Sequence, residues 1–197
     1  MKHLGILSRL QLQLAPLKKG GRPHRWYDPS PLLAVDRLLL TPRGAIAQVD
    51  GRSLMDVHHA DHPDTRIDPD EQNTLTMGFT SHYRAMRDRF GEHMADGMAG
   101  ESLIVDCPVP VRLHEVARGI LIRGKNGSEI HLREVSIARP CVEFSRWALG
   151  GESGSAEPAL LKEALQFLDE GMRGFRMGLA DETPVWVEIG DEVLSAS

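Results

Sequence analysis

Short apolar runs, broken every few residues by glycine or proline, are the feature that most restricts the fold of this chain. The 197 residues include 19 glycines and 12 prolines, and no apolar run approaches the roughly 20 residues that a membrane-spanning helix needs. In residues 10–14, Leu-Gln-Leu-Gln-Leu, apolar and polar side chains alternate. A period of two is the pattern of a strand with one buried face. We therefore expect a fold built from short strands.

Turn-forming residues locate further strands. A Pro-x-Gly turn joins strand candidates at residues 35–40 and 45–49, and the Asn-Gly pair at residues 126–127 is a strong hairpin turn. After this second turn the apolar positions shift phase at Glu134, which predicts a β-bulge. The other strand candidates are residues 102–106, 111–116, 120–123, 175–179 and 185–189.

Two stretches have helical spacing instead. Residues 81–90 and residues 158–170 each place apolar side chains on one face of a helix. Capping residues flank both stretches: Thr80 or Ser81 and then Gly91 for the first, and Ser155 and then Gly171 for the second. Seven to nine short strands with two or three inserted helices predict a mostly β barrel rather than a βαβ layered fold. We expect one domain over residues 1–197, with loops at residues 15–31, 56–73 and 150–155.

Charge and targeting signals exclude several classes of function. The chain has 23 Lys and Arg against 28 Asp and Glu, a net charge of −5, whereas a nucleic-acid binder usually shows a basic excess. Residues 17–22 are the one concentrated basic stretch, and no phosphate-binding loop or nucleophile-elbow motif is present. The first residues lack the pattern of a signal peptide. We expect a cytoplasmic protein with reduced cysteines that binds neither nucleic acid nor a membrane.

The stretch around Cys141 is the best candidate for chemistry. A strand ends at Pro140, and Phe144 and Trp147 follow at the spacing of a short helix, which places Cys141 at the helix N-terminus. Unpaired N–H groups there, with arginines nearby, stabilise a thiolate, which serves as a nucleophile, a persulfide carrier or a soft metal ligand. The alternative is a buried structural cysteine. We expect Cys107, which no helix follows, to be of that structural kind.

Three segments, in this order, resemble the MOSC domain, a family named for the C-terminal region of molybdenum cofactor sulfurases. Residues 97–105 resemble its Gly-Glu-Asn-Leu segment, and residues 139–144, Arg-Pro-Cys-Val-Glu-Phe, resemble its cysteine motif. Residues 171–176 leading to residues 187–193 resemble its terminal strand pair. The resemblance covers about residues 30–194 and implies a MOSC-type β-barrel.

The resemblance also implies a function. In the family the motif cysteine, here Cys141, carries sulfur or coordinates molybdenum held by a pterin dithiolene, the molybdenum cofactor, and some members reduce N-hydroxylated compounds. A small-molecule substrate and a redox or sulfur-donor protein are the implied partners. Arg139, Arg146 and Arg173 are candidates by residue type for binding the pterin phosphate. The alternative, from another class, is a non-catalytic binding module that keeps the barrel with a degenerate cofactor site.

The loop before the first helix departs from the family pattern. Members commonly show a Gly-Asp element and then a His-Gly-Gly element, of which residues 55–63 preserve Asp56 and His59 without the glycines. One hypothesis is that His59 and Glu101 converge on Cys141 as proton donors, because a hydroxylamine leaving oxygen needs an acid near the metal. A rival hypothesis is a zinc or other divalent-metal site, for which the candidate ligands are Asp56, His58, His59, Asp61, His62 and Asp64.

Overall fold

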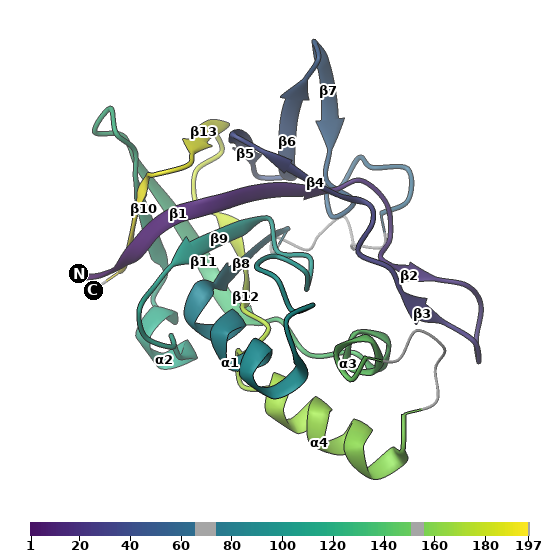
Figure 1. Ribbon diagram of the computed structural model, residues 1–197. Helices are drawn as coiled ribbons and strands as arrows, with labels where there is room; N and C mark the ends of the chain where they lie inside the picture. Colours follow the sequence, from purple (N-terminus) through teal and green to yellow (C-terminus); the bar gives the residue numbers. More distant parts are fainter. Residues whose placement is uncertain (66–73, 151–155, 197) are drawn as a thin grey trace.

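Seven strands close into a barrel. The computed structural model describes residues 1–65, 74–150 and 156–196. The strands follow the order β14–β10–β11–β12–β8–β9–β1, and β14 pairs again with β1, so the sheet closes on itself (Figure 1). This confirms the mostly β barrel expected from the sequence. The barrel strands are β1 (Lys2–Gln13), β8 (Leu75–Phe79), β9 (Leu103–Asp106), β10 (Ile120–Arg123), β11 (Glu129–Ile137), β12 (Phe175–Leu179) and β14 (Glu192–Ser195).

Smaller strand groups are added to the barrel. β4 (Leu32–Val35) pairs with the end of β1, and β2 (Lys18–Lys19) pairs with β3 (Trp26–Tyr27) in a separate two-stranded hairpin. A four-stranded sheet has the order β13–β5–β6–β7, and β6 and β7 project away from the barrel (Figure 1). Its strands are β5 (Arg37–Thr41), β6 (Gly44–Val49), β7 (Arg52–Met55) and β13 (Val185–Glu188).

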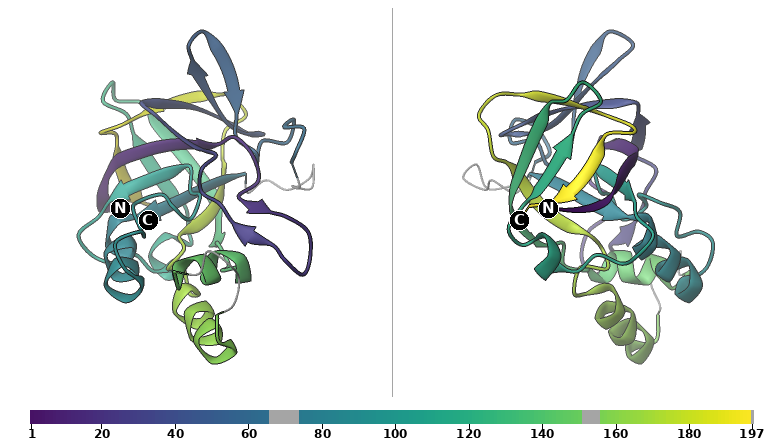
Figure 2. Two further views of the ribbon diagram at one scale, coloured as in Figure 1. Left: turned by 45° about the vertical axis from the view of Figure 1, so that its right-hand side comes forward. Right: turned by 90° about the vertical axis from the view of Figure 1, so that its left-hand side faces the viewer.

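Four helices gather on one side of the barrel, as two further views show (Figure 2). α1 joins β8 to β9, and the two strands are parallel, as a helical crossover allows. α3 packs against α4 and against β3. The chain ends lie side by side, because Lys2 of β1 pairs with Ser195 of β14. The helices are α1 (Thr80–Phe90), α2 (Leu113–Val116), α3 (Val142–Ala148) and α4 (Pro158–Leu168).

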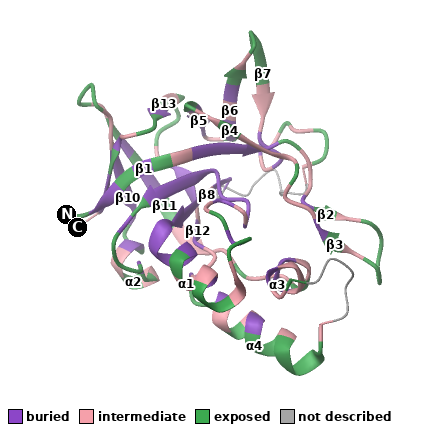
Figure 3. Ribbon diagram, viewed as in Figure 1, coloured by how far each residue is buried: buried purple, intermediate pink, exposed green. Residues whose placement is uncertain are grey.

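Two apolar cores support this arrangement, and buried positions follow the barrel strands and the inner helix faces (Figure 3). The larger core fills the barrel with side chains such as Leu7, Leu40 and Phe175. The smaller core joins α1, α3 and the β2–β3 hairpin through residues that include Tyr83 and Phe144. The second core holds the helices in place beside the barrel, and the candidate site lies next to it.

Local turn predictions are confirmed. β5 pairs with β6 and β10 pairs with β11 in antiparallel hairpins around the two predicted turns. Glu134 has a φ of 56°, and the register of β11 against β12 shifts between Arg133 and Ser136. The predicted bulge is therefore present. Such features depend on a few neighbouring residues, which is why the sequence predicts them well.

Other local predictions are wrong. Residues 111–116 were expected to be a strand, but Leu113–Val116 is a helical turn because Glu115 accepts a hydrogen bond from the Arg112 backbone N–H, 2.9 Å, in a capping box. Residues 15–31 contain β2 and β3 rather than only loop. The described residues hold fourteen strands and four helices, more than predicted, because several strands are only two to four residues long.

The expected N-cap of α1 is also wrong. The helix begins at Thr80 with Phe79 as its cap, because the Thr80 hydroxyl is used elsewhere: it donates to Asp106, 2.9 Å, and accepts from the backbone of Cys107, 3.0 Å. α4 begins at Pro158 after Glu157, and Ser155 lies outside the described residues. So do residues 66–73 and 151–155 of the predicted loops.

None of the four helices in the described residues is long and apolar enough to cross a membrane.

His82 makes the fold sensitive to acid. Its Nε2 lies 3.0 Å from both the backbone N and O of Val111, and burial lowers its pKa to about 4 from the ordinary 6.5. The unfolded chain therefore takes up a proton at this residue at a higher pH than the folded chain. We expect the free energy of unfolding to fall by up to about 3 kcal/mol between pH 6.5 and pH 4.

Urea denaturation at several pH values measures this effect. His82→Gln should flatten the decrease, whereas His24→Gln, at an exposed histidine, should leave it unchanged. An equal decrease in wild type and His82→Gln would contradict the assignment.

Candidate functional site

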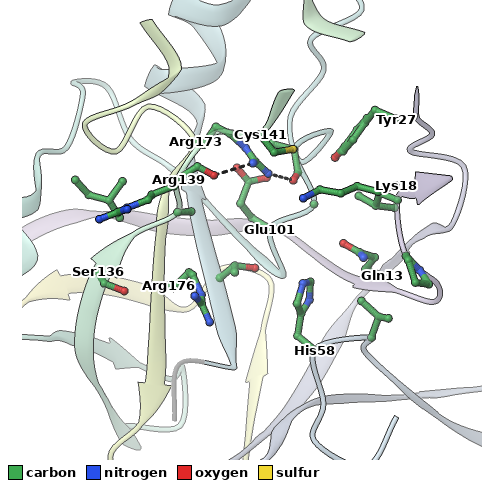
Figure 4. Close-up of a pocket in the computed structure, with 18 of the residues that line it drawn as sticks. Gln13, Lys18, Tyr27, His58, Glu101, Ser136, Arg139, Cys141, Arg173 and Arg176 are labelled. Carbon is green, nitrogen blue, oxygen red and sulfur yellow. Dashed lines mark hydrogen bonds between the residues drawn. The ribbon is translucent and has the colours of Figure 1, made fainter. Parts of the chain in front are cut away.

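A cavity of about 640 Å³ lies beside barrel strands, the β2–β3 hairpin and the N-cap residue of α3 (Figure 4). It brings together segments that are far apart in the sequence: the end of β1, the β2–β3 hairpin, the turn after β7, residues 99–101, residues 136–141 and residues 173–176. Cys141, Glu101, Arg139 and Arg173, four of the residues proposed from the sequence, line it.

Cys141 is the N-cap residue of α3, as predicted. Its backbone is extended, with φ −120° and ψ 154°, and its carbonyl accepts hydrogen bonds from the Ser145 N–H, 3.0 Å, and hydroxyl, 2.9 Å. The thiol is partly exposed and forms no disulfide. Cys107 is buried instead, and its Sγ–H donates to the Val109 carbonyl, 3.1 Å, as expected of a structural cysteine.

An aromatic cluster fixes the position of α3. The ring of Phe144 packs edge-on against Tyr27 with centroids 5.1 Å apart, and it stacks on Trp147 at 5.8 Å. Tyr27 also donates its hydroxyl to the carbonyl of Met98, 2.8 Å. Burial raises the pKa of Tyr27 far above its ordinary value. This phenol therefore stays protonated beside the cavity, and the helix that carries Cys141 is held against the hairpin wall.

Glu101 is a buried carboxyl group at the cavity. It is 3% exposed, and its Oε2 accepts a hydrogen bond from the Tyr83 hydroxyl, 2.6 Å. Tyr83 in turn accepts from the Ala99 backbone N–H, 3.0 Å. Oε1 has no hydrogen-bond partner among the described residues. Burial raises the pKa of Glu101, against the opposing effects of the Tyr83 hydrogen bond and the Arg173 charge. The group keeps a proton to a higher pH than an exposed glutamate and is suited to act as an acid.

Arg173 joins the two segments that carry Cys141 and Glu101. Its Nη2 donates to the Ala99 carbonyl, 2.8 Å, and its Nη1 donates to the Arg139 carbonyl, 3.2 Å (Figure 4). The guanidinium lies 4.6 Å from the centre of the Phe144 ring, a favourable cation–π arrangement. The sequence suggested Arg173 as a ligand-binding cation. The structure shows that its planar group also binds the backbone two residues before Glu101 and two residues before Cys141.

Two predicted site residues lie elsewhere. Arg146 does not line this cavity, and its Nε is buried without a hydrogen-bond partner among the described residues. His59 is 4% exposed and faces a different cavity, beside Arg43 and Asp61. Burial lowers the pKa of His59. The expected convergence of His59 with Glu101 on Cys141 is therefore wrong, because the chain turn after Asp56 directs consecutive histidines to opposite sides.

The proposed divalent-metal site also fails to form. Across the described residues, no group of three or more His, Cys, Asp or Glu side chains is arranged to hold a metal ion. Asp56 is instead occupied by hydrogen bonds to Gln13 and His58, and Asp61 pairs with Arg43. Buried Asp56 and exposed Asp61 thus both have protein partners.

Sequence reasoning missed Lys18 and Arg176 and considered His58 only as a ligand of a divalent metal. Lys18, His58 and Arg176 line the cavity together with the predicted residues. Only the basic stretch at residues 17–22 hinted at Lys18. Among the described residues, the lining includes the cationic side chains of Lys18, Arg139, Arg173 and Arg176 and the carboxyl groups of Glu101 and Asp64. An excess of positive charge favours an anionic ligand.

Three solved structures have a similar fold. The YuaD protein from Bacillus subtilis aligns with a TM-score of 0.56 at 11% identity over 95% of this chain and 93% of that one. A hypothetical protein aligns with a TM-score of 0.55 at 14% identity, over 99% of this chain and 70% of that one. YiiM from Escherichia coli, a MOSC-domain protein, aligns with a TM-score of 0.50 at 19% identity, over 84% of this chain and 65% of that one. No protein-family model and no curated protein matches the sequence. At these identities the similarity establishes the fold alone, a barrel of the MOSC type.

Glu101→Gln should stabilise the protein at neutral pH. The glutamine amide keeps an oxygen that accepts the Tyr83 hydrogen bond. The substitution also removes a carboxyl group that is costly to ionise because it is buried. Because the folded-state pKa is raised, the stabilisation should appear as pH rises above the ordinary value of 4.5 and vanish below it. Thermal unfolding measures the stabilisation, because Tm rises by roughly 2–4 °C for each kcal/mol of added unfolding free energy. A variant less stable than wild type at pH 7 would contradict this account.

Arg173→Met should loosen the site. Loss of the two hydrogen bonds to backbone carbonyls should cost about 2 kcal/mol of unfolding free energy, and Cys141 should react at a changed rate with iodoacetamide. Arg173→Lys should recover only part of both effects, because an ammonium lacks the planar fork. The matched control is Arg118→Met, at an exposed position outside the cavity; an equal effect there would show that Arg173 has no special role.

Proposed function

We propose that this chain binds a molybdenum–pterin cofactor through Cys141 and reduces N-hydroxylated small molecules. The observation that carries the proposal is the meeting of three features in one cavity: a partly exposed cysteine at a helix start, a buried carboxyl group with a raised pKa, and an excess of cationic side chains. The similarity to MOSC-type barrels supports it at the level of fold.

The residues present fit such a cofactor. A cysteine thiolate is a soft ligand of the kind that molybdenum accepts, and arginine or lysine side chains suit a phosphate group. Lys18, Arg139 and Arg173 make no ion pair with a carboxylate among the described residues. A volume of about 640 Å³ is in the range of small-molecule and cofactor sites.

Each residue has a distinct part in this proposal. The cofactor, when bound, supplies the redox chemistry. Cys141 would ligate the metal, and Lys18 and Arg139 would bind the anionic group. Glu101 would donate a proton to the leaving oxygen of the substrate, with Tyr83 holding the carboxyl group in place. Arg173 would fix the position of the Cys141 segment relative to the Glu101 segment.

Elemental analysis tests the proposal. The full chain, purified from a host that makes the cofactor, should contain stoichiometric molybdenum and pterin. Cys141→Ser should lose at least about nine-tenths of the molybdenum, because a hydroxyl is a much poorer ligand for a soft metal. Cys107→Ser is the matched control and should retain it.

Other outcomes of the elemental analysis would lead to different conclusions. Equal molybdenum in wild type and Cys141→Ser would refute the role of this thiol. If the wild-type protein contains no molybdenum but its intact mass is larger by one sulfur atom, the protein is a sulfur carrier. Neither molybdenum nor sulfur would favour the non-catalytic binding module.

A further inference from the structure

His58 faces the cavity from the turn after β7. In Figure 4 its ring points inward, and it lies well apart from Cys141 and Glu101. The side chain is partly exposed, unlike that of the neighbouring His59. The cavity therefore has an imidazole at a distance from the cysteine.

A buried carboxylate fixes this ring. Asp56 is 1% exposed, and its Oδ1 lies 2.7 Å from Nδ1 of His58 and accepts the His58 backbone N–H at 2.9 Å. Its Oδ2 accepts the backbone N–H of Gln13, at the end of β1, at 2.7 Å. An ionised carboxylate can only accept hydrogen bonds, so the Nδ1 atom carries the proton directed at Asp56. Nε2 has no hydrogen bond to the described residues and is the nitrogen left for a ligand.

The surroundings make this more than a structural contact. A carboxylate that orients an imidazole through Nδ1 selects its tautomer and stabilises its protonated form. Among the described residues, no Lys or Arg side chain is hydrogen-bonded to Asp56. The carboxylate, the imidazole and the cavity thus form one continuous arrangement.

We propose that His58 is an acid–base residue of this cavity and that Asp56 is its positioning residue. This inference rests on the proposed function, because the ligand is taken to be an N-hydroxylated small molecule. His58 as imidazolium gives its Nε2 proton to an oxygen or nitrogen atom of the ligand. It is left as neutral imidazole, with the Nδ1 proton still donated to Asp56, and it regains a proton from water. The step moves one proton and no electrons.

Charged groups of both signs face the ring. Asp56 lies behind it, Asp64 and Lys18 line the same cavity, and Arg176 lines it from β12. Glu101 lies toward Cys141 (Figure 4). Because the two acid–base groups lie apart, they would serve different atoms of one ligand: Glu101 the atom nearest the thiol, and His58 a more distant one.

Nuclear magnetic resonance of the full chain with ¹⁵N-labelled histidines tests the geometry. Neutral His58, assigned by its absence in His58→Gln, should carry its proton on Nδ1, whereas exposed His24 should show mainly the Nε2–H form that free imidazole prefers. Asp56→Asn should reduce the Nδ1–H preference of His58 and leave His24 unchanged. The Nε2–H form at His58 in wild type would overturn the proposal, whether or not the protein holds molybdenum.

The pH–rate profile of molybdenum-loaded protein tests the proton transfer, with benzamidoxime as substrate and dithionite-reduced methyl viologen as reductant. His58→Gln should retain its molybdenum, lose one limb of the profile and lower kcat by about 100-fold or more. His24→Gln should match wild type. An unchanged profile in His58→Gln would overturn the proposal while leaving the cofactor assignment intact. If wild type lacks molybdenum, the proposed function fails, and the tautomer measurement decides the assignment of His58 and Asp56.

Discussion

The pairing of β1 with three different strands is the constraint on which the rest of the molecule depends. The first residues of β1 pair with β14 and close the barrel, the middle pairs with β9, and the last residues pair with β4. The polar end of this strand then reaches the site. The Gln11 side chain donates to the carbonyls of Gly97 and Glu101, both at 2.8 Å, and the backbone of Gln13 donates to Asp56. One strand therefore closes the barrel and holds two parts of the cavity wall.

Several polar groups are buried in and beside the cavity wall, and each is costly to bury. Glu101 and Asp56 are almost completely buried, and Arg173 donates hydrogen bonds to two backbone carbonyls. Burial of the Glu101 carboxyl group costs free energy, and it raises the pKa of that group. A raised pKa of this kind is typical of functional clefts. Glu101 and Arg173 both line the same cavity.

Particular residues show how far the sequence predicted the site. The position of Cys141 at a helix start, and the presence of Glu101, Arg139 and Arg173 in the cavity, agree with the sequence analysis. His59 is the histidine that matches the family's His-Gly-Gly element, but His58 is the one that lines the cavity. Sequence pattern does not reveal which way a non-periodic turn directs each side chain. Arg146 was included because it is near Cys141 in sequence, yet one turn of α3 carries it away from the cavity.

The hairpins, the bulge at Glu134 and the cysteine at the start of α3 follow from local sequence, because each depends on φ preferences and hydrogen bonds within a few residues. Which side chains share a cavity depends on contacts between distant segments. Cys141 and Glu101 are far apart along the chain but line the same cavity, and Arg173, from a third segment, binds the backbone beside both. Barrel closure sets such contacts, and it is a collective result of strand register that no local pattern contains.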